Sequence, residues 1–382
     1  MRLCAFGTYE RDFVRNRTIR NGLRACGWEV EECHAPVWER QRNKTGRYLG
    51  VLSLCRVSGR LIVSYVRLLL RYTFTVRRYD IMLVGYIGHL DLLFAGLLTR
   101  IPRRRPLVFD PLISLYDTLV ADRAAFPSDS LIGRLLWQLD RSTCRMADLV
   151  LLDTNAHIEY FVTTFHLPRE KFVRVFVGAE SDLFAPRTQA GRTDEFRVLF
   201  VGKFTPLHGL LTIIQAAKLL ETDPQIMFDI IGSGQLSDEV HQLAVQLDVR
   251  AVQFTDWVEY ENLPERMAAA DVCLGIFGTT DKADRVIPAK VFTALAMRKP
   301  LITGDSTAIR ELLIDGESAV LCRRGDPEAL SQAIRRLKSD AAFRERLADA
   351  GHQVYCEQAS EARIGRAVTA ALTRLVPDES PR

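Results

Sequence analysis

Residues 285–311, RVIPAKVFTALAMRKPLITGDSTAIRE, predict a loop, a helix, a short buried strand and a second helix, in that order. Pro288 suits a helix N-terminus because its missing N–H is not needed there, and KVFTALAM places apolar residues at helical spacing. Pro300 ends that helix, and the LIT after it is typical of a short strand. This alternation of helix and strand is the repeating unit of an α/β fold.

The same stretch suits an anionic ligand. After Gly304, Ser306 or Thr307 can cap the second helix, so we expect two helix N-termini close together. Their unpaired backbone N–H groups and positive dipole ends favour a diphosphate, and Arg285 and Lys290 add positive charge beside them. We therefore predict the functional site here.

Length and composition indicate an ordinary globular protein with two domains. The chain has 382 residues, of which 48% are hydrophobic and 26% charged. Its eight cysteines are scattered without a C-x-x-C pair, which indicates reduced thiols rather than a disulfide or zinc framework. The N-terminal MRLCAFGTYE predicts a strand and a turn rather than a signal peptide. We therefore expect a cytoplasmic location.

Positive charge is concentrated in the first half of the chain. Residues 1–192 hold 29 Lys+Arg and 19 Asp+Glu, net +10, and residues 193–382 hold 22 and 28, net −6, which together give the +4 of the whole chain. Ten basic residues and no acidic residue lie between positions 40 and 79. This asymmetry favours an anionic partner. Because no nucleic-acid-binding motif accompanies it, we rank an anionic membrane surface above nucleic acid and predict no nucleic-acid partner.

An arginine row runs through this basic tract, at Arg56, Arg60, Arg67 and Arg71. On a continuous helix, at about 100° per residue, these positions and Arg78 fall within a wedge of roughly 60°. The residues between them are largely apolar, but the arginines interrupt the segment too often for an ordinary transmembrane span. The segment is either a buried helix with one solvated face or a helix that also contacts lipid, and we favour lipid contact in addition to packing.

Four apolar runs in the first half, RLCAFG, DIMLVG, PLVFD and DLVLLDT, predict strands of a parallel sheet. Each run is followed by glycine or polar residues at its C-terminal end, where ligands bind in doubly wound sheets. We therefore expect one edge of a cleft to be lined by Gly7, Gly88, His89, Asp110 and Asp153.

The alternation restarts after a polar segment. PRTQAGRTDE, residues 186–195, has the composition of a linker, and RVLFVG, MFDIIG and DVCLGIF predict further strands. We predict two Rossmann-like, doubly wound α/β domains that face each other across a cleft. The first spans residues 1–186, the linker 187–195 and the second domain 196–354, and a C-terminal helix at about 355–375 packs back on the first domain in this prediction.

Four segments, VRVFVGAESDLFAP, VGKFTPLHG, FDIIGSGQ and ALAMRKPLITGDSTAIRELLIDG, carry motifs in a fixed order. They resemble, in that order, the inter-domain segment G-x-D-x-x-x-F-x-P, the V-G-R-x…K-G loop, the second strand with its glycine turn, and the signature A-x-x-K-P-[VIL]-I…E-L…D-G of the family 4 or group 1 glycosyltransferases. That family has the GT-B fold. An ordered set of motifs is far more specific than one glycine pattern. The resemblance covers most of residues 148–340 and implies an N-terminal acceptor domain and a C-terminal donor domain.

The resemblance implies a site for a nucleotide-diphosphate sugar and no cofactor besides this co-substrate. It aligns Lys203 and His208 with the family's phosphate-binding Arg and Lys, and Arg285 and Thr293 with the two carboxylates of its E-x7-E motif. The second carboxylate holds ribose hydroxyls in the family, so Thr293 is a departure from the pattern. The other predicted donor-site residues are Gly7, Gly202, Gly232, Gly234, Trp257, Val258, Lys290 and Glu311.

Several of these donor-site residues also have structural explanations. Gly232 and Gly234 suit either the close approach of a phosphate or ribose or an ordinary turn. Trp257 either stacks on the base or fills a gap in the core, and we favour the core. Arg285 either meets the diphosphate or an anionic donor sugar, or points to water. Glu311 is either a donor-site residue or a favourable charge in the first turn of a helix.

Asp110, His89 and Lys203 are the catalytic candidates. Asp110 ends an apolar strand and is the carboxylate best placed to meet an acceptor hydroxyl, and His89, at a predicted helix N-terminus, is the alternative base. A turn or cap is the structural alternative for Asp110, and a helix-start position for His89. Enzymes of family 4 retain the anomeric configuration, and such a transfer needs no strong enzymatic base. Lys203 would stabilise the departing diphosphate.

The sequence contains no D-x-D, H-E-x-x-H, G-x-S-x-G or G-x-x-x-x-G-K-[ST] motif, so we predict no metal site. Our leading prediction is a retaining, metal-independent glycosyltransferase that moves a sugar from a nucleotide-diphosphate sugar to a cell-surface glycan or lipid-linked precursor. It would act in the cytoplasm, peripherally at the inner face of the cell membrane. The alternatives are a catalytically silent GT-B subunit that binds nucleotide sugar or glycan, which the missing E-x7-E carboxylates favour, and a GT-B nucleotide-sugar epimerase.

Overall fold

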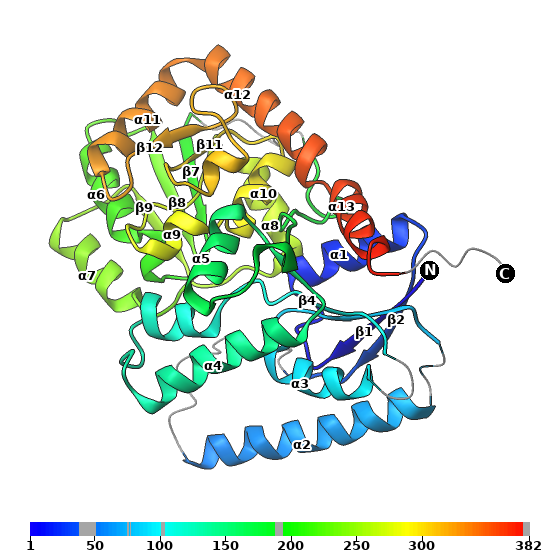
Figure 1. The fold of residues 1–382 in the computed structure, drawn as a ribbon. Helices are drawn as coiled ribbons and strands as arrows, with labels where there is room; N and C mark the ends of the chain where they lie inside the picture. The colour runs from blue at the N-terminus through cyan, green and yellow to red at the C-terminus, as the bar shows by residue number, and fades with distance from the viewer. Residues whose placement is uncertain (38–50, 75, 77, 101–103, 188–193, 377–382) are drawn as a thin grey trace. The chain divides into compact units, whose positions relative to one another are not determined.

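The computed structural model describes residues 1–37, 51–74, 76, 78–100, 104–187 and 194–376. They form two compact units (Figure 1). Unit 1 is Met1–Phe176 together with the segment that begins at Glu361, and unit 2 is Val177–Ser360. Unit 1 therefore ends earlier than the boundary that we predicted at residue 186, and most of the predicted linker lies outside the described residues.

Unit 1 is built on a parallel six-stranded sheet with the order β2-β1-β3-β4-β5-β6. Its strands are β1 Arg2–Gly7, β2 Glu29–His34, β3 Ile81–Val84, β4 Leu107–Phe109, β5 Leu149–Leu152 and β6 Phe172–Arg174. β1 pairs with β2 on one side and with β3 on the other, so the strand order reverses between β1 and β3. The central strands are continuous apolar runs because both faces of the sheet are covered.

Helices cover the two faces of this sheet and enclose two apolar clusters. α1 Val14–Ala25 and α13 Glu361–Thr373 lie on one face, and the other helices are α2 Val51–Phe74, α3 His89–Leu98, α4 Leu131–Met146 and α5 Asn155–Phe165. Two short segments complete the unit, the π-helical η1 Asp117–Asp122 and the 3-10 turn η2 Arg169–Lys171.

The C-terminal helix α13 belongs to unit 1 because it packs closely on α1. A Cβ at Gly22 would lie 2.8 Å from the Cα of Gly365, so the two helices approach at paired glycines. Trp28 Nε1 donates to Thr369 Oγ1 over 3.0 Å, and Asn21 donates to Glu361 over 3.1 Å. Helices α1 and α13 therefore cover this face of the sheet together.

Unit 2 repeats the architecture with a second parallel six-stranded sheet, ordered β12-β11-β10-β7-β8-β9. Its strands are β7 Phe196–Val201, β8 Ile226–Ile231, β9 Val252–Thr255, β10 Val272–Leu274, β11 Leu301–Gly304 and β12 Val320–Cys322. Its helices are α6 Leu210–Leu220, α7 Ser237–Gln246, α8 Leu263–Ala269, α9 Asp281–Arg285, α10 Ala289–Ala296, α11 Pro327–Ser339 and α12 Ala341–Val354. The short turns are η3 Pro206–His208, η4 Tyr260–Asn262 and η5 Ile309–Glu311, and η6 Tyr355–Ala359 is π-helical.

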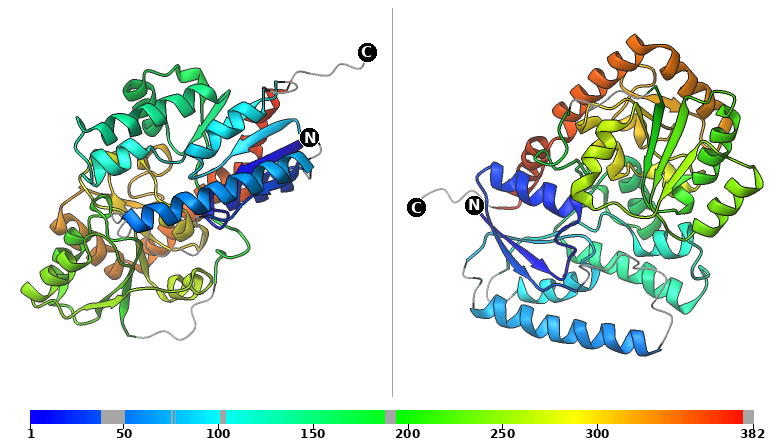
Figure 2. Two further views of the ribbon diagram at one scale, coloured as in Figure 1. Left: turned by 90° about the horizontal axis from the view of Figure 1, so that it is seen from below. Right: turned by 180° about the vertical axis from the view of Figure 1, so that it is seen from behind.

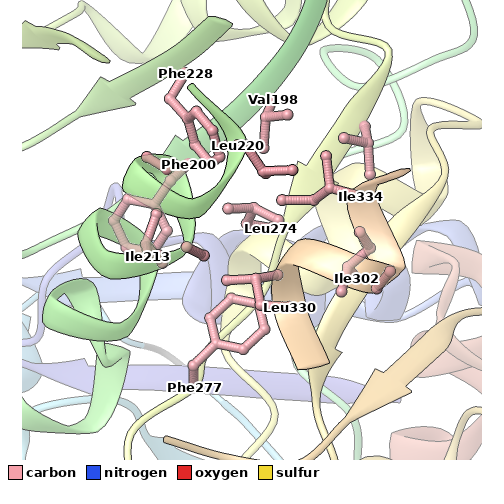
Figure 3. Packing of buried hydrophobic residues seen from close by; sticks show 14 of the residues in the cluster. Val198, Phe200, Ile213, Leu220, Phe228, Leu274, Phe277, Ile302, Leu330 and Ile334 are labelled. Carbon is pink, nitrogen blue, oxygen red and sulfur yellow. The ribbon is translucent and has the colours of Figure 1, made fainter. Parts of the chain in front are cut away.

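The main core of unit 2 lies between the sheet and helices α6 and α11. Figure 3 shows Phe200 and Leu274 from the sheet, with Ile213 of α6 and Leu330 of α11 packed against them. These side chains are at most 2% exposed. The core holds the C-terminal ends of β7 and β10 in place, and the loops that follow these strands contain the candidate site.

The predicted fold class, doubly wound α/β with two parallel sheets, is confirmed. The helix predicted after Pro288 is α10, with Pro288 at its N-cap. The helix predicted after Gly304 is wrong, because that segment forms only the 3-10 turn η5. The N-cap of this turn is Ala308, although the Oγ of Ser306 accepts from the N–H of Ile309 over 3.1 Å. Only one of the two expected α-helical N-termini is therefore present.

Candidate functional site

Two glycine loops meet at the C-terminal ends of β7 and β8. Gly202 follows β7 with φ +156°, and Gly232 follows β8 with φ +140°, both in the region that favours glycine. A Cβ at Gly232 would lie 1.9 Å from the carbonyl oxygen of Gly202, and one at Gly234 would lie 2.7 Å from the amide nitrogen of Phe204. The packing of one loop's backbone on the other therefore accounts for Gly232 and Gly234 without a ligand.

Lys290, in the first turn of α10, directs its ammonium group at the first of these loops. Its Nζ lies 3.6 Å from the centroid of the Phe200 ring and 2.5 Å from the position that a Cβ of Gly202 would take. Nζ is buried and forms no hydrogen bond with any part of the chain that the structure describes. Burial holds the pKa of Lys290 well below its ordinary value. A buried amine without an acceptor is unfavourable, so the position suits an incoming anion.

Lys203 and His208 lie on the same loop, beside Gly202. Lys203 is exposed. The Nδ1 atom of His208 contacts the carbonyl oxygen of Lys203, which fixes Nδ1 as the donor, and the hydroxyl of Thr205 lies 3.3 Å from the same nitrogen. The Cε1 atom of His208 is 3.5 Å from the Cβ position of Gly202, which Lys290 also approaches. His208 and Lys290 therefore converge on one point of the β7 loop.

Two residues replace the E-x7-E carboxylates: one at the C-terminal end of α9 and the other within α10. Arg285 is the last residue of α9 and is partly buried. Thr293 is 7% exposed, and its hydroxyl donates to the carbonyl oxygen of Lys290 over 3.0 Å. The hydroxyl hydrogen of Thr293 is thus engaged in its own helix. Glu311 ends the turn η5 and is partly buried.

Trp257 follows β9 and does not fill the core, so our preferred explanation for it is wrong. The side chain is 51% exposed, and its Nε1 donates to Glu259 Oε1 over 3.3 Å. An indole that is half exposed at the end of a strand can stack on a flat ligand. Val258, the next residue, is partly buried.

In unit 1, Asp110 forms a buried ion pair that the sequence analysis missed. Asp110 is 1% exposed and follows β4, and its carboxylate accepts from Nε of Arg15 over 2.9 Å and lies 2.8 Å from Nη2. Arg15 is fully buried in α1 and also donates to the carbonyl oxygen of Val175 over 2.5 Å. Burial raises the pKa of Asp110, and the charge of Arg15 opposes that rise. The pair gives Asp110 a structural role, and its catalytic role stays a prediction.

His89 begins α3, as predicted, but its ring is buried rather than at an open edge. It is 2% exposed, and its Nε2 lies 3.1 Å from Asp140 Oδ1. Asp140 also accepts from the hydroxyl of Ser114 over 2.6 Å and from the amide of Tyr116 over 2.9 Å. The role of His89 as a base likewise stays a prediction.

The remaining strand ends of unit 1 also have internal partners. At Gly7, with φ +130°, a Cβ would lie 2.4 Å from Asp91 Oδ2. Asp91 accepts from the amide of Thr8 over 2.7 Å and from the hydroxyl of Tyr65 over 2.9 Å, and burial raises its pKa to about 6. Asp153 Oδ1 lies 2.7 Å from Nδ1 of His157. These contacts account for Gly7 by the packing of Asp91 against it.

No group of three or more His, Cys, Asp or Glu side chains within the described ranges could hold a metal ion. The convergence of cationic and glycine residues after β7 is the arrangement in this structure that best suits a phosphate-containing ligand.

Comparison with known proteins finds a family match in the second half of the chain. The family described as "Glycosyl transferases group 1" matches residues 184–354, which cover nearly all of unit 2. Unit 2 is therefore similar to the group 1 glycosyltransferases over nearly its whole length. The matched segment contains all of the donor-site residues predicted in the second half of the sequence. These include Lys290, Trp257 and the residues of the β7 and β8 loops.

The chain is also similar to curated proteins that are named as glycosyltransferases. It is 27% identical over 168 residues to the lipopolysaccharide core biosynthesis glycosyltransferase LpsE of Rhizobium meliloti, which covers 44% of this chain and 46% of LpsE. It is 24% identical over 222 residues to the alpha-D-kanosaminyltransferase of Streptomyces kanamyceticus, covering 55% and 56%. The chain spans about half the length of these sequence relatives.

Solved structures confirm the GT-B fold over the whole chain. Sucrose-phosphate synthase from Thermosynechococcus elongatus matches with a TM-score of 0.74 at 17% identity, over 98% of both chains. HepE of Anabaena, in complex with UDP, matches with a TM-score of 0.67 at 17% identity, over 98% of this chain and 99% of that one. At these identities the likeness establishes the fold alone.

Proposed function

We propose that this protein is a group 1 glycosyltransferase that transfers a sugar from a nucleotide-diphosphate sugar to a glycan or lipid-linked acceptor in cell-surface glycan or glycolipid assembly. The observation that supports this most strongly is the Nζ of Lys290, which is buried at the glycine loop after β7 without a hydrogen-bond acceptor in the described chain. A diphosphate would supply the missing acceptor. Further support comes from LpsE, whose name places it in lipopolysaccharide core synthesis, and from HepE, whose structure holds UDP.

In this proposal the positive groups of unit 2 stabilise the departing diphosphate. Lys290 meets it from the buried side, and Lys203 and His208 meet it from the loop. Charge that develops on a leaving group is stabilised most strongly by donors that are already in place, because they need no reorganisation. These three groups supply the charge that a metal ion would otherwise provide, which is why we propose a metal-independent transfer. The sequence resemblance adds retention of the anomeric configuration to the proposal.

The donor's other parts are assigned to residues around this loop. Trp257, half exposed after β9, is proposed to stack on the base. Arg285 is proposed to meet the donor sugar or the diphosphate, where its planar fork suits either a carboxylate or a phosphate. Asp110 and His89 are less suited to serve as an acceptor-side base, since both are buried and paired within unit 1.

A catalytically silent subunit that binds nucleotide sugar is the second candidate. It is favoured by Thr293, whose hydroxyl hydrogen is bound to the carbonyl of Lys290 and which replaces a carboxylate of the family pattern. A hydroxyl in place of a carboxylate loses about 1–3 kcal/mol of ribose binding unless another group compensates. This candidate predicts binding of the donor without turnover.

We also propose that the reaction takes place at the inner face of the cell membrane. A lipid-linked acceptor is held there, and α2 presents Arg60, Arg67 and Arg71 as exposed cations. The predicted arginine row is shorter than expected. The Arg56 side chain lies outside the described residues, and Arg78 lies beyond the end of α2.

A thermal-shift panel of nucleoside diphosphates and nucleotide sugars tests the function directly. The protein should be stabilised by at least one nucleotide, and its best nucleotide-sugar ligand should then be hydrolysed slowly or transferred to an added lipid acceptor. Binding without any turnover would favour the silent subunit. Stabilisation by no member of the panel would reject both candidates.

A further inference from the structure

Exposed apolar side chains are concentrated on two neighbouring helices of unit 1. The described residues include seventeen large hydrophobic side chains that are exposed, and nine of them lie on α2 and α3. We call these nine the α2–α3 face: Ile62, Val63, Val66, Leu69, Leu70, Phe74, Leu90, Phe94 and Leu97. Scattered single hydrophobic residues need no explanation, but a contiguous set of this size marks an interaction site.

The face is continuous because α2 lies beside α3 (Figure 2). The Tyr65 ring of α2 stacks on the Phe94 ring of α3, with the ring centroids 4.2 Å apart. Phe94 is itself 46% exposed and belongs to the row formed by Leu90 and Leu97 on α3. The exposed row of α3 therefore borders α2 directly.

Helix α2 is amphipathic, but much of its apolar surface points away from its own domain. Leu68 and Ser64 are buried and hold the helix to the sheet. At about 100° per residue, the exposed apolar residues of α2 occupy an arc of roughly 140° that begins on the α3 side, where Leu69 lies, and ends at Phe74. The packing of unit 1 itself does not need these side chains.

Positive charge lies along the far edge of this apolar arc. On the same helical projection, Arg60, Arg67 and Arg71 fall within about 40° next to Phe74. All three are exposed, and Arg71 also donates to the carbonyl oxygen of His34 over 3.3 Å. Helix α2 contains no acidic residue, and the one acidic residue of α3, Asp91, is buried. Within α2 and α3, the exposed charges beside the apolar arc are therefore cationic.

We propose that the α2–α3 face docks unit 1 on an anionic lipid bilayer, with its apolar side chains in the boundary between headgroups and acyl chains and its arginines at the lipid phosphates. The inference rests in part on the proposed function, whose lipid-linked acceptor is held in such a bilayer. An apolar arc bordered by arginines fits an interfacial helix that lies in the plane of the membrane. No helix in the described ranges is long and apolar enough to span a bilayer. A nucleic acid does not suit the face, because most of its area is hydrocarbon rather than cation.

Vesicle co-sedimentation in the absence of nucleotide and acceptor tests the surface separately from catalysis. The full chain is mixed with vesicles of phosphatidylcholine alone or with phosphatidylglycerol added, at low and high salt. We expect binding to require the anionic lipid and to weaken, but not disappear, at high salt. Val66→Ser/Leu70→Ser/Phe74→Ser should lower partitioning by about tenfold or more. Arg60→Gln/Arg67→Gln should lower it by about 30-fold, and Arg60→Lys/Arg67→Lys should restore most of the binding.

A matched control removes an equally exposed apolar residue from another surface. Val245, on α7 of unit 2, is 80% exposed, and Val245→Ser should leave vesicle binding unchanged. A Phe74→Trp variant reports on depth by comparison with the wild type, whose four tryptophans set the background. Brominated lipids should quench the variant's fluorescence more strongly if the new side chain reaches the acyl chains. All of these positions are exposed, so the variants should fold, which circular dichroism checks.

Equal partitioning of wild type and the apolar triple variant would overturn the proposal. Quenching in the Phe74→Trp variant that is no stronger than in the wild type would also overturn it. If the wild type is instead a dimer that the triple variant converts to a monomer, the face binds a second copy and the proposal is also overturned. Loss of vesicle binding with intact nucleotide binding would leave the proposed function standing, so the two can fail separately.

Discussion

Replacing Lys290 by Met tests whether this residue belongs to the donor site. The structure predicts that the substitution stabilises the ligand-free protein and weakens nucleotide binding. The Nζ of Lys290 lies buried over the Phe200 ring without a hydrogen-bond acceptor in the described chain. An unsatisfied buried polar group costs about 1–3 kcal/mol, and Met offers nearly the same volume without that group. Lys290→Met should therefore stabilise the ligand-free protein, and each 1 kcal/mol gained should raise the melting temperature by about 2–4 °C in a unit of this size.

The same substitution should weaken binding of the nucleoside diphosphate. It removes one charge-assisted contact, worth about 1.5–3 kcal/mol, which corresponds to a loss of affinity of about 10- to 150-fold. Differential scanning fluorimetry measures the first effect, and isothermal titration calorimetry with the best ligand measures the second. The matched control is Lys299→Met: Lys299 Nζ donates to the carbonyl oxygens of Ala268 and Ala270 over 2.6 and 2.9 Å, so its loss should destabilise the fold and leave affinity unchanged.

The pH dependence follows from the lowered pKa of Lys290. Folding releases the proton of this amine at any pH between the lowered pKa and the ordinary value of about 10.4, because the unfolded chain binds more protons there. Its contribution to stability therefore rises with pH through that window. A bound diphosphate reverses the shift, so ligand binding should take up a proton, and the binding enthalpy should differ between buffers of different ionisation enthalpy.

The reasoning would be refuted if folded Lys290→Met were less stable than the wild type and bound the nucleotide with unchanged affinity. That result would mean that the ammonium is satisfied in the ligand-free protein and takes no part in binding. Stabilisation without loss of affinity would retain the structural part of the account and remove Lys290 from the donor site.

Three further predictions concern other parts of the chain. Lys203→Ala should lower transfer by a factor of roughly 10 to 1000 with little change in melting temperature, because the residue is exposed; unchanged kinetics would reject its assignment. Thr293→Glu should fold and keep nucleotide binding by calorimetry, since it restores a residue of the family pattern, and loss of binding in the folded variant would show a differently built ribose pocket. Arg15→Met should destabilise the protein by about 3–5 kcal/mol in urea unfolding because it leaves the Asp110 carboxylate buried and unpaired, whereas Arg15→Met/Asp110→Leu should recover most of that loss; equal stabilities would contradict the structural role of the pair.

Local patterns in the sequence were sufficient to predict the fold. The apolar runs that end at Gly7 and Asp110 are strands of one parallel sheet, and Pro288 marks the start of α10, because periodicity and helix-start signals act over a few residues. In the segment after Gly304, the Ser306 hydroxyl accepts from the N–H of Ile309, but the segment forms only a 3-10 turn, so the possible capping residue did not predict a helix.

Side-chain partners were beyond the reach of the sequence, because they depend on which strand ends meet. Arg15 and Asp110 are 95 residues apart and form a fully buried pair, and His89 meets Asp140 from a different helix. The same holds for the loop glycines. A side chain at Gly232 would collide with the backbone of Gly202, and no local motif reveals this contact between the loops after two strands. The sequence analysis predicted Lys290 beside a helix N-terminus, but only the structure showed that its Nζ is buried without an acceptor among the described residues.

The most direct test of the central claim is calorimetric titration of the full chain with a panel of nucleoside diphosphates and their sugars, repeated for Lys290→Met. The account predicts that the wild type binds at least one nucleoside diphosphate with uptake of a proton, and that the Met variant binds it more weakly without that uptake. Failure of the folded wild type to bind any member of the panel would contradict the claim that the β7 loop and Lys290 form a nucleotide-sugar site.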